Sequence, residues 1–231
     1  MLWLRLATLY HPAAEMITDT MLIRRSLLVC FTLLALCGWV RHDALAQNAA
    51  LTAQASTFVD KLGKDAVAVM ADKRLTKSQR VDKFRTLLHA GFDLPTVARF
   101  VLGRYWNTTT PAQQQEYLIQ FEEMVVRSYA ERFDSYNGET FKIVSSRPDG
   151  DHDAFVITSI IRPDGPPVGV EWRVRQRDNR LGIIDVVVEG VSMSVTQRQE
   201  FSSVIQAKAG NMDAFLQALK EKNASMAAAV Q

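Results

Sequence analysis

The sequence has little cysteine, and the little it has is confined to one segment. Its 231 residues contain two cysteines, Cys30 and Cys37, and both lie in the apolar run Leu27–Val40. A chain that loses this run on export keeps no thiol with which to form a disulfide. The sequence therefore excludes a disulfide-stapled scaffold, and the fold must depend on its hydrophobic core.

Long apolar runs are also scarce, and the run at Leu27–Val40 has the features of a signal peptide. Two arginines at positions 24 and 25 precede it, and the small-residue tripeptide at 44–46 follows it as a cleavage site. The run is shorter than the about 20 residues that a permanent membrane-spanning helix needs. We therefore predict a signal peptide region over residues 1–46, with Met21 as an alternative start, cleavage after Ala46, and a mature protein in the periplasm.

An excess of charge of either sign is absent as well. The whole chain has 27 Lys and Arg and 25 Asp and Glu, and removing the four basic and three acidic residues of positions 1–46 leaves 23 and 22. Proteins that bind nucleic acid without sequence preference need a strong basic surplus. The balance therefore excludes that class of function.

Motifs of covalent chemistry are missing too. The sequence has no P-loop, no glycine-rich dinucleotide fingerprint, no nucleophile elbow and no pair of metal-spaced histidines. We therefore predict no catalytic site, no metal site and no cofactor. One alternative stays open, because Asp185 and Glu189 share one face of a predicted strand and form a candidate acid and base pair in a small-molecule cavity.

Hydrophobic periodicity indicates helices at both ends of the mature chain and strands between them. Apolar residues recur at helical spacing in the first part, and after Gly138 the period changes to two. The turn-rich separators between the strands favour an antiparallel meander. The predicted helices cover 47–73, 76–90, 93–103, 110–137, a segment from 196, and 212–223, and the predicted strands cover 140–146, 154–162, 168–177 and 181–189.

This order of elements is typical of an α+β fold in which helices cover one face of an antiparallel sheet. We assign residues 47–222 to this one α+β domain. The tail 223–231 is predicted to be disordered.

The stretch GVEWRVRQRDNRLGIIDVVVEGVSM, residues 169–193, contains more apolar strand residues than one buried face of a sheet requires. In its first half Val170, Trp172 and Val174 alternate with charged residues, so they share one strand face. In its second half, residues 183–188 are apolar on nearly both faces. A solid core and a hollow between sheet and helices both explain such a pattern, and periodicity does not separate them.

Arginines 173, 175, 177 and 180 form a row on the opposite face of the same hairpin. Such a row is typical of a solvated sheet face that discourages edge pairing. A docking surface for an acidic partner or for lipid head groups is the alternative.

Three segments resemble a known family. FDLPTVARFVLGRYWNTTTPAQQQEYLIQFEEMV, SYAERFDSYNGETFKI and VEGVSMSVTQRQEF are similar to the periplasmic lipid-shuttle proteins of the Mla (maintenance of lipid asymmetry) pathway, the MlaC family, also described as toluene-tolerance auxiliary components. A hopanoid-associated branch of that family is similar as well. The resemblance covers about residues 58–219 in the same order of helices and strands.

The resemblance implies both a fold and a function. It implies a curved, four-stranded antiparallel sheet of the NTF2/cystatin-like kind, covered on one face by N-terminal and C-terminal helices, with an apolar cavity between. The cavity would hold phospholipid acyl chains as cargo. The implied partners are an MCE-domain protein of an inner-membrane ABC transporter and an outer-membrane lipoprotein complex. A hopanoid remains the alternative cargo.

We predict a set of lipid-binding residues that lines this cavity. They comprise inward-facing strand positions and aromatic or apolar residues of the helices and of the segment before the fifth helix. The set is Phe155, Ile157, Val170, Trp172, Val174, Val187, Tyr105, Trp106, Phe121, Tyr129, Val191 and Met193.

Overall fold

The computed structural model describes residues 46–130 and 136–229. Apart from Ala46, the predicted signal peptide lies outside these residues, so its cleavage stays a prediction. Within the two described ranges, no helix combines the length and the apolar character that crossing a membrane requires. The residues from Asn48 onward form one unit by their internal contacts.

The N-terminal half is helical, and local capping signals explain where its helices begin. At the start of the second helix, the hydroxyl of Thr76 accepts a hydrogen bond from Gln79 N at 3.2 Å, and Gln79 Oε1 accepts one from Thr76 N at 2.9 Å. Thr110 and Gln113 make the same pair of bonds at 3.3 and 3.0 Å. The helices are an N-terminal helix over 46–71, α2 (Lys77–Gly91), α3 (Leu94–Leu102), the 3-10 helix η1 (Gly103–Thr108) and α4 (Pro111–Ala130).

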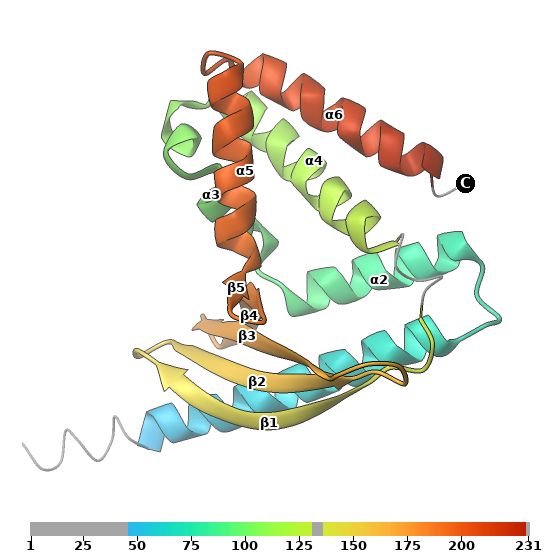
Figure 1. Cartoon of the computed structure of the whole chain (residues 1–231). Helices are drawn as coiled ribbons and strands as arrows, with labels where there is room; N and C mark the ends of the chain where they lie inside the picture. The colour runs from blue at the N-terminus through green and yellow to red at the C-terminus, as the bar shows by residue number, and fades with distance from the viewer. Residues whose placement is uncertain (1–45, 131–135, 230–231) are drawn as a thin grey trace, which may run out of the picture. The chain divides into compact units, whose positions relative to one another are not determined.

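The strands form one antiparallel sheet whose order in space, β1-β2-β3-β4-β5, follows the order in the chain (Figure 1). The four predicted strands are confirmed. The fifth, β5, has two residues and is too short to produce a period of two, so the sequence pattern did not reveal it. The strands are β1 (Thr140–Asp149), β2 (Asp153–Ile161), β3 (Val168–Arg177), β4 (Arg180–Val188) and β5 (Val191–Ser192).

Two irregularities interrupt the ladders of this curved sheet. The pairing of β1 with β2 shifts between Ile143 and Ser145, and that of β3 with β4 shifts between Arg173 and Val174. An extra residue in one strand bends it and increases its twist. The second shift leaves Ile184, the residue before Asp185, without a partner in β3.

Two helices close the chain, α5 (Met193–Ala207) and α6 (Met212–Ala229). The helix α5 begins before the predicted position because Ser192 caps it, accepting a hydrogen bond from Val195 N at 3.1 Å. The helix α6 continues to Ala229, through residues 223–229 of the predicted disordered tail 223–231, and residues 230–231 lie outside the described part of the chain. Alanine has the highest helix propensity, and Asn223 holds this part of α6 to α4 by donating to Gln120 O at 3.0 Å.

Among the described residues, buried apolar side chains form two large cores and a smaller cluster of Leu88, Leu94 and Val126. In the first, α3, α4, α5 and α6 surround Tyr117, which is fully buried and donates a hydrogen bond to Ala98 O at 2.9 Å. Phe201 and Phe215 stack edge to face beside it, with ring centroids 5.0 Å apart. The second core joins the N-terminal helix to the sheet and contains Leu51, Ala55, Val59, Ala154, Val156, Val174 and Ile183.

The arrangement confirms an α+β fold and refines the predicted cover of the sheet. The N-terminal helix packs directly on the buried sheet face. Of the two C-terminal helices, α5 meets the sheet at β4 and β5, whereas α6 packs along α4 (Figure 1). The α-helical layer made by α3 to α6 therefore stands beside the sheet, and α2 bridges the two parts by contacting both α4 and β4.

Candidate functional site

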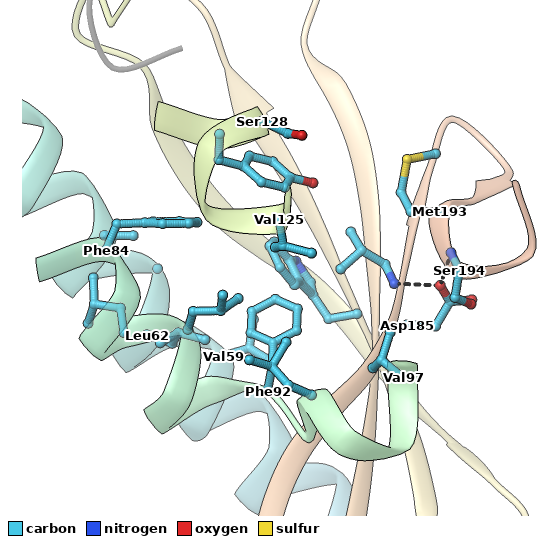
Figure 2. A pocket seen from close by; sticks show the side chains of 18 of the residues that line it. Val59, Leu62, Phe84, Phe92, Val97, Val125, Ser128, Asp185, Met193 and Ser194 are labelled. Carbon is cyan, nitrogen blue, oxygen red and sulfur yellow. Dashed lines mark hydrogen bonds between the residues drawn. The ribbon is translucent and has the colours of Figure 1, made fainter. Parts of the chain in front are cut away.

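A cavity of about 540 Å³ lies where the N-terminal helix, α2, α3 and α4 meet the inner face of the sheet. Figure 2 shows the lining side chains converging from these elements on one space. Pockets of about 300–1,000 Å³ are the size that encloses small ligands or apolar chains. The described residues thus contain a hollow between the helices and the sheet, which answers the question left by the sequence pattern.

The helical wall of the cavity is apolar along most of its length. The N-terminal helix and α2 supply one side of this wall, and α3 and α4 supply the other. Near one end, the rings of Phe84 and Tyr129 lie with their centroids 5.8 Å apart. The lining residues of these helices include Val59, Leu62, Ala66, Val67, Met70, Phe84, Leu87, Leu88, Val97, Val101, Phe121, Met124, Val125, Ser128 and Tyr129.

The sheet wall is formed by Thr140 and Phe141 of β1, Thr158 and Ile160 of β2, Trp172 of β3 and Val186 of β4. Its interior polar groups are paired. Trp172 Nε1 donates to Thr158 Oγ1, whose hydroxyl donates to Val170 O. A buried polar group that is hydrogen-bonded leaves the surroundings effectively apolar. The sheet therefore presents hydrocarbon and aromatic surface to the cavity.

A close contact between the N-terminal helix and β1 shapes the wall. The Phe141 ring lies so near the Gly63 backbone that a Cβ at position 63 would overlap it. Glycine at this position lets the edge strand approach the helix. Both residues line the cavity.

Polar side chains gather at the end of the cavity where β4 meets α5. The carboxylate of Asp185 accepts hydrogen bonds from Val186 N at 2.9 Å, Ser192 Oγ at 2.6 Å and Ser194 N at 3.1 Å. Figure 2 shows Asp185 and Ser194 facing each other at this end. A carboxylate at a helix N-terminus satisfies free N–H groups and is favoured by the helix dipole. Asp185 therefore holds the start of α5 in place.

This geometry does not support the alternative in which Asp185 and Glu189 act as a catalytic acid and base. The Asp185 carboxylate is occupied by the three donors that position α5, and the Glu189 carboxylate accepts a hydrogen bond from Gly169 N at the end of the β4 strand. Glu189 is exposed. The two carboxylates thus serve separate structural contacts, and within the described residues no group of three or more His, Cys, Asp or Glu is placed to hold a metal ion.

Four of the twelve predicted lipid-binding residues line the cavity: Phe121, Tyr129, Trp172 and Met193. They come from α4, β3 and α5, so the structure brings together residues that are far apart in the sequence. Whether they contact a lipid stays a prediction.

The prediction that Phe155, Ile157 and Val187 face inward is wrong. The buried face of β2 carries Ala154, Val156 and Thr158, so Phe155 and Ile157 point to the other face. Phe155 lies there beneath Arg147, whose Cζ is 4.1 Å from the ring centroid. Val187 pairs with Glu171 on this outer face. The sequence of β2 is apolar at both parities, which is why alternation alone assigned the wrong one.

Five further predicted residues lie outside the cavity wall. Val170 and Val174 have the predicted parity and are buried, with exposures of 3% and 0%, and Val174 belongs to the core that joins the N-terminal helix to the sheet. Tyr105 and Trp106 pack against the helical core from η1. Val191 is 52% exposed in β5.

The largest omission of the predicted set is the wall formed by the N-terminal helix and α2. Residues such as Leu62, Val67 and Phe84 line the cavity. Their helical spacing is visible in the sequence, but the same spacing is produced by residues of a filled core. No sequence signal distinguishes the two.

The basic row on the outer sheet face is largely neutralised. Arg173 pairs with Asp149 at 2.8 Å and with Asp153 at 3.0 Å, and Arg175 pairs with Asp153 at 2.7 Å. Arg177 lies 3.7 Å from Asp93. The hydrogen bonds that Arg175 donates to the Asp153 carboxylate raise the pKa of Arg175 against the opposing effect of burial. The row therefore makes the ion pairs of an ordinary sheet surface. It leaves little unpaired positive charge with which to bind a docking partner.

Comparison with known proteins gives three results. The sequence model of the MlaC protein family matches residues 60–221. A curated relative from Haemophilus influenzae, the intermembrane phospholipid transport system binding protein MlaC, is 29% identical over 97 residues. That match covers 40% of this chain and 45% of the relative, so the chain is matched to less than half the length of that protein.

The third result is a structural similarity. A phospholipid-binding protein from Ralstonia solanacearum, solved in complex with a phospholipid, superposes with a TM-score of 0.66 and 25% sequence identity. The superposition covers 74% of this chain and 98% of that protein. The shared fold therefore includes nearly all of a protein that holds a phospholipid.

Proposed function

Because the chain belongs to the MlaC protein family, we propose that it is a periplasmic lipid carrier that encloses phospholipid acyl chains in the cavity between sheet and helices. In this proposal the carrier moves lipid between an outer-membrane lipoprotein complex and an inner-membrane ABC transporter with an MCE-domain protein. It acts by binding and does no covalent chemistry. The phospholipid complex of the Ralstonia solanacearum protein, which shares the fold, supports the choice of cargo.

The observation that carries the proposal is the apolar cavity of about 540 Å³. Each methylene group left in water costs about 0.8 kcal/mol, so two chains of roughly thirty methylenes in all would cost on the order of 25 kcal/mol. A carrier has to remove most of that surface from water. Walls of Leu, Val, Met and aromatic side chains provide such an environment, and the polar residues near α5 lie at one end of it.

Transfer by such a carrier depends on its partners. The sequence has no nucleotide-binding motif, so the chain has no energy source of its own. A ligand equilibrium is shifted only by a difference in affinity between two states. The MCE-domain protein and its transporter would therefore supply the direction of lipid movement.

The test is to fill the cavity without disturbing the fold. Ala66 lines the cavity, whereas Ala68 lies exposed on the same helix. The exported chain, Ala66→Trp and Ala68→Trp are purified from the periplasm without detergent, and native mass spectrometry measures the lipid bound to each. The same spectra distinguish a glycerophospholipid from a hopanoid by mass.

We expect lipid on the unchanged chain and on Ala68→Trp, and a loss of most of it on Ala66→Trp, because the indole occupies the space of the acyl chain. Thermal melting of both variants verifies that they are folded. If the unchanged chain carries no lipid, or if folded Ala66→Trp carries as much as Ala68→Trp, the cavity is not the lipid site.

A further inference from the structure

Three arginines and three aromatic rings form a continuous surface on α3, η1 and α5. This arginine–aromatic surface consists of Arg99, Phe100, Arg104, Tyr105, Trp106 and Arg198. Its elements pack on one another, since α3 contacts both η1 and α5. The Arg198 side chain crosses from α5 to η1, where a Cβ at Gly103 would lie 2.9 Å from Arg198 Nε. The six residues therefore belong to one surface and not to separate sites.

This surface faces away from the cavity. On α3, Val97 and Val101 line the cavity, while Arg99 and Phe100 are exposed. On α5, Gln197 lines the cavity and Arg198 is exposed. A partner bound to the arginine–aromatic surface would thus leave the cavity lining free.

Each guanidinium of the surface is held over a ring. The Cζ atom of Arg99 is 5.7 Å from the Trp106 ring centroid, that of Arg104 is 5.0 Å from Tyr105, and that of Arg198 is 5.0 Å from Phe100. Arg104 also donates a hydrogen bond to Tyr105 Oη at 3.0 Å. Stacking on a ring orders the planar guanidinium and leaves most of its N–H groups available.

No described carboxylate neutralises the charges of this surface. Across residues 46–130 and 136–229, neither Arg99, Arg104 nor Arg198 makes an ion pair with a carboxylate. The segment 94–108 contains no acidic residue. The arginines of the outer sheet face differ, because Arg147, Arg173 and Arg175 all have carboxylate partners.

An apolar centre accompanies these charges. Phe100 is 42% exposed, and Val195, one turn before Arg198 on α5, is 41% exposed. Residues three apart on a helix lie on the same face, which places Val195 beside the Phe100 contact. Protein interfaces are enriched in aromatic and arginine side chains and depleted of lysine. Residues of the enriched types carry most of the binding energy.

We propose that the arginine–aromatic surface is a docking site for a protein whose complementary face carries carboxylates around an apolar residue. The ordered guanidiniums would receive the carboxylates as bidentate pairs, and Phe100 would pack against the apolar residue. A membrane surface fits less well. Anionic lipid is attracted by clusters of about four to eight Lys and Arg, whereas segments 94–108 and 193–207 contain three arginines and no lysine.

The test compares two charge reversals of equal size. Arg99→Glu with Arg104→Glu changes the proposed site, and Arg162→Glu with Arg180→Glu changes two exposed arginines of the hairpins, which have no ion pair among the described residues. The protein probe is the purified MCE-domain protein from the same genome, a choice that rests on the proposed function. The membrane probe is a vesicle of phosphatidylglycerol and phosphatidylethanolamine. Biolayer interferometry measures the affinity for each.

We expect the MCE-domain protein to bind the unchanged chain, to lose about tenfold or more in affinity for the Arg99 and Arg104 variant, and to change by less than about twofold for the hairpin variant. Phe100→Ala should weaken binding as well, without a change in net charge. Vesicles should not bind. Thermal melting confirms that each variant is folded.

Three results would overturn the docking site. The first is equal affinity for the two charge-reversed variants. The second is vesicle binding that only the Arg99 and Arg104 variant loses, which would make the occupant a membrane. The third is a chain that carries phospholipid but does not bind the MCE-domain protein, and in that case the lipid-binding part of the proposed function stands while the docking site fails.

Discussion

The indole Nε1 of Trp172 donates a hydrogen bond of 2.9 Å to the hydroxyl of Thr158 on the neighbouring strand. Thr158 is 1% exposed, and its hydroxyl donates to Val170 O at 3.0 Å. Both side chains line the cavity. The pair allows a broad aromatic surface to face the cavity while its only polar atom is satisfied.

We expect Thr158→Val to lower the free energy of unfolding by about 1–3 kcal/mol, because it leaves the indole N–H without its acceptor in the interior. Thr158→Ser keeps the hydroxyl and is the matched control, with a smaller loss from the missing methyl group. Urea denaturation of the three proteins measures the difference. Because valine keeps the methyl group, a Thr158→Val variant as stable as the unchanged chain would show that the hydrogen bond does not stabilise this wall.

Tyr117 provides a prediction for alkaline pH. Burial raises its pKa well above the usual value of 10. The folded state therefore holds the phenol proton more tightly than the unfolded state, so this stability is complete below the unfolded pKa and is lost as the pH rises above about 10. Above that pH, we expect the unchanged chain to lose up to about 1.4 kcal/mol per pH unit more than Tyr117→Phe.

The measurement is chemical denaturation of both proteins between neutral pH and pH 11. Near neutral pH, Tyr117→Phe should be less stable by about 1 kcal/mol, because it lacks the hydrogen bond to Ala98 O. The two stability curves should then converge as the pH rises. Parallel curves over the whole range would contradict a buried phenol.

The parts of the fold that could be predicted from the sequence depend on local signals. Thr76 with Gln79, and Thr110 with Gln113, mark helix starts that the structure confirms, because a capping box is contained in four consecutive residues. The alternation of Val170, Trp172 and Val174 also assigned one face of β3 correctly. Charged residues on the opposite face made that parity unambiguous.

The parts that could not be predicted depend on contacts between distant segments. The strand β2 has apolar side chains on both faces, so its parity was decided by the N-terminal helix, whose Ala55 and Val59 pack with Ala154 and Val156. For the same reason the sequence did not reveal that Leu62 and Phe84 line a cavity. A helix that borders a hollow and a helix that borders a filled core have the same apolar stripe.

Asp185 gives a prediction for the polar end of the cavity. We expect Asp185→Ala to lower the free energy of unfolding by about 1–2 kcal/mol, because it removes the acceptor for Ser194 N and Ser192 Oγ at the start of α5. Hydrogen exchange should increase in residues 193–197. Asp151→Ala in the exposed β1–β2 turn is the control, and we expect it to change neither quantity. An unchanged first turn of α5 would contradict the capping role.

Gly63 and Phe141 give the last prediction, which separates helix propensity from packing. In an open helix position, Gly→Ala stabilises by about 1 kcal/mol. At position 63 we expect the opposite sign, because the new Cβ would overlap the Phe141 ring, which lines the cavity. Phe141 must then move, and both stability and lipid content should fall.

The double variant Gly63→Ala with Phe141→Leu decides whether that contact is the cause. Leucine is shorter than phenylalanine, so it leaves room for the Cβ, and the double variant should regain stability relative to Gly63→Ala alone. Phe141→Leu by itself measures the loss of aromatic packing, and the four proteins together form a double-mutant cycle. Additive effects in this cycle would mean that Gly63 is required for a reason other than the approach of β1 to the N-terminal helix.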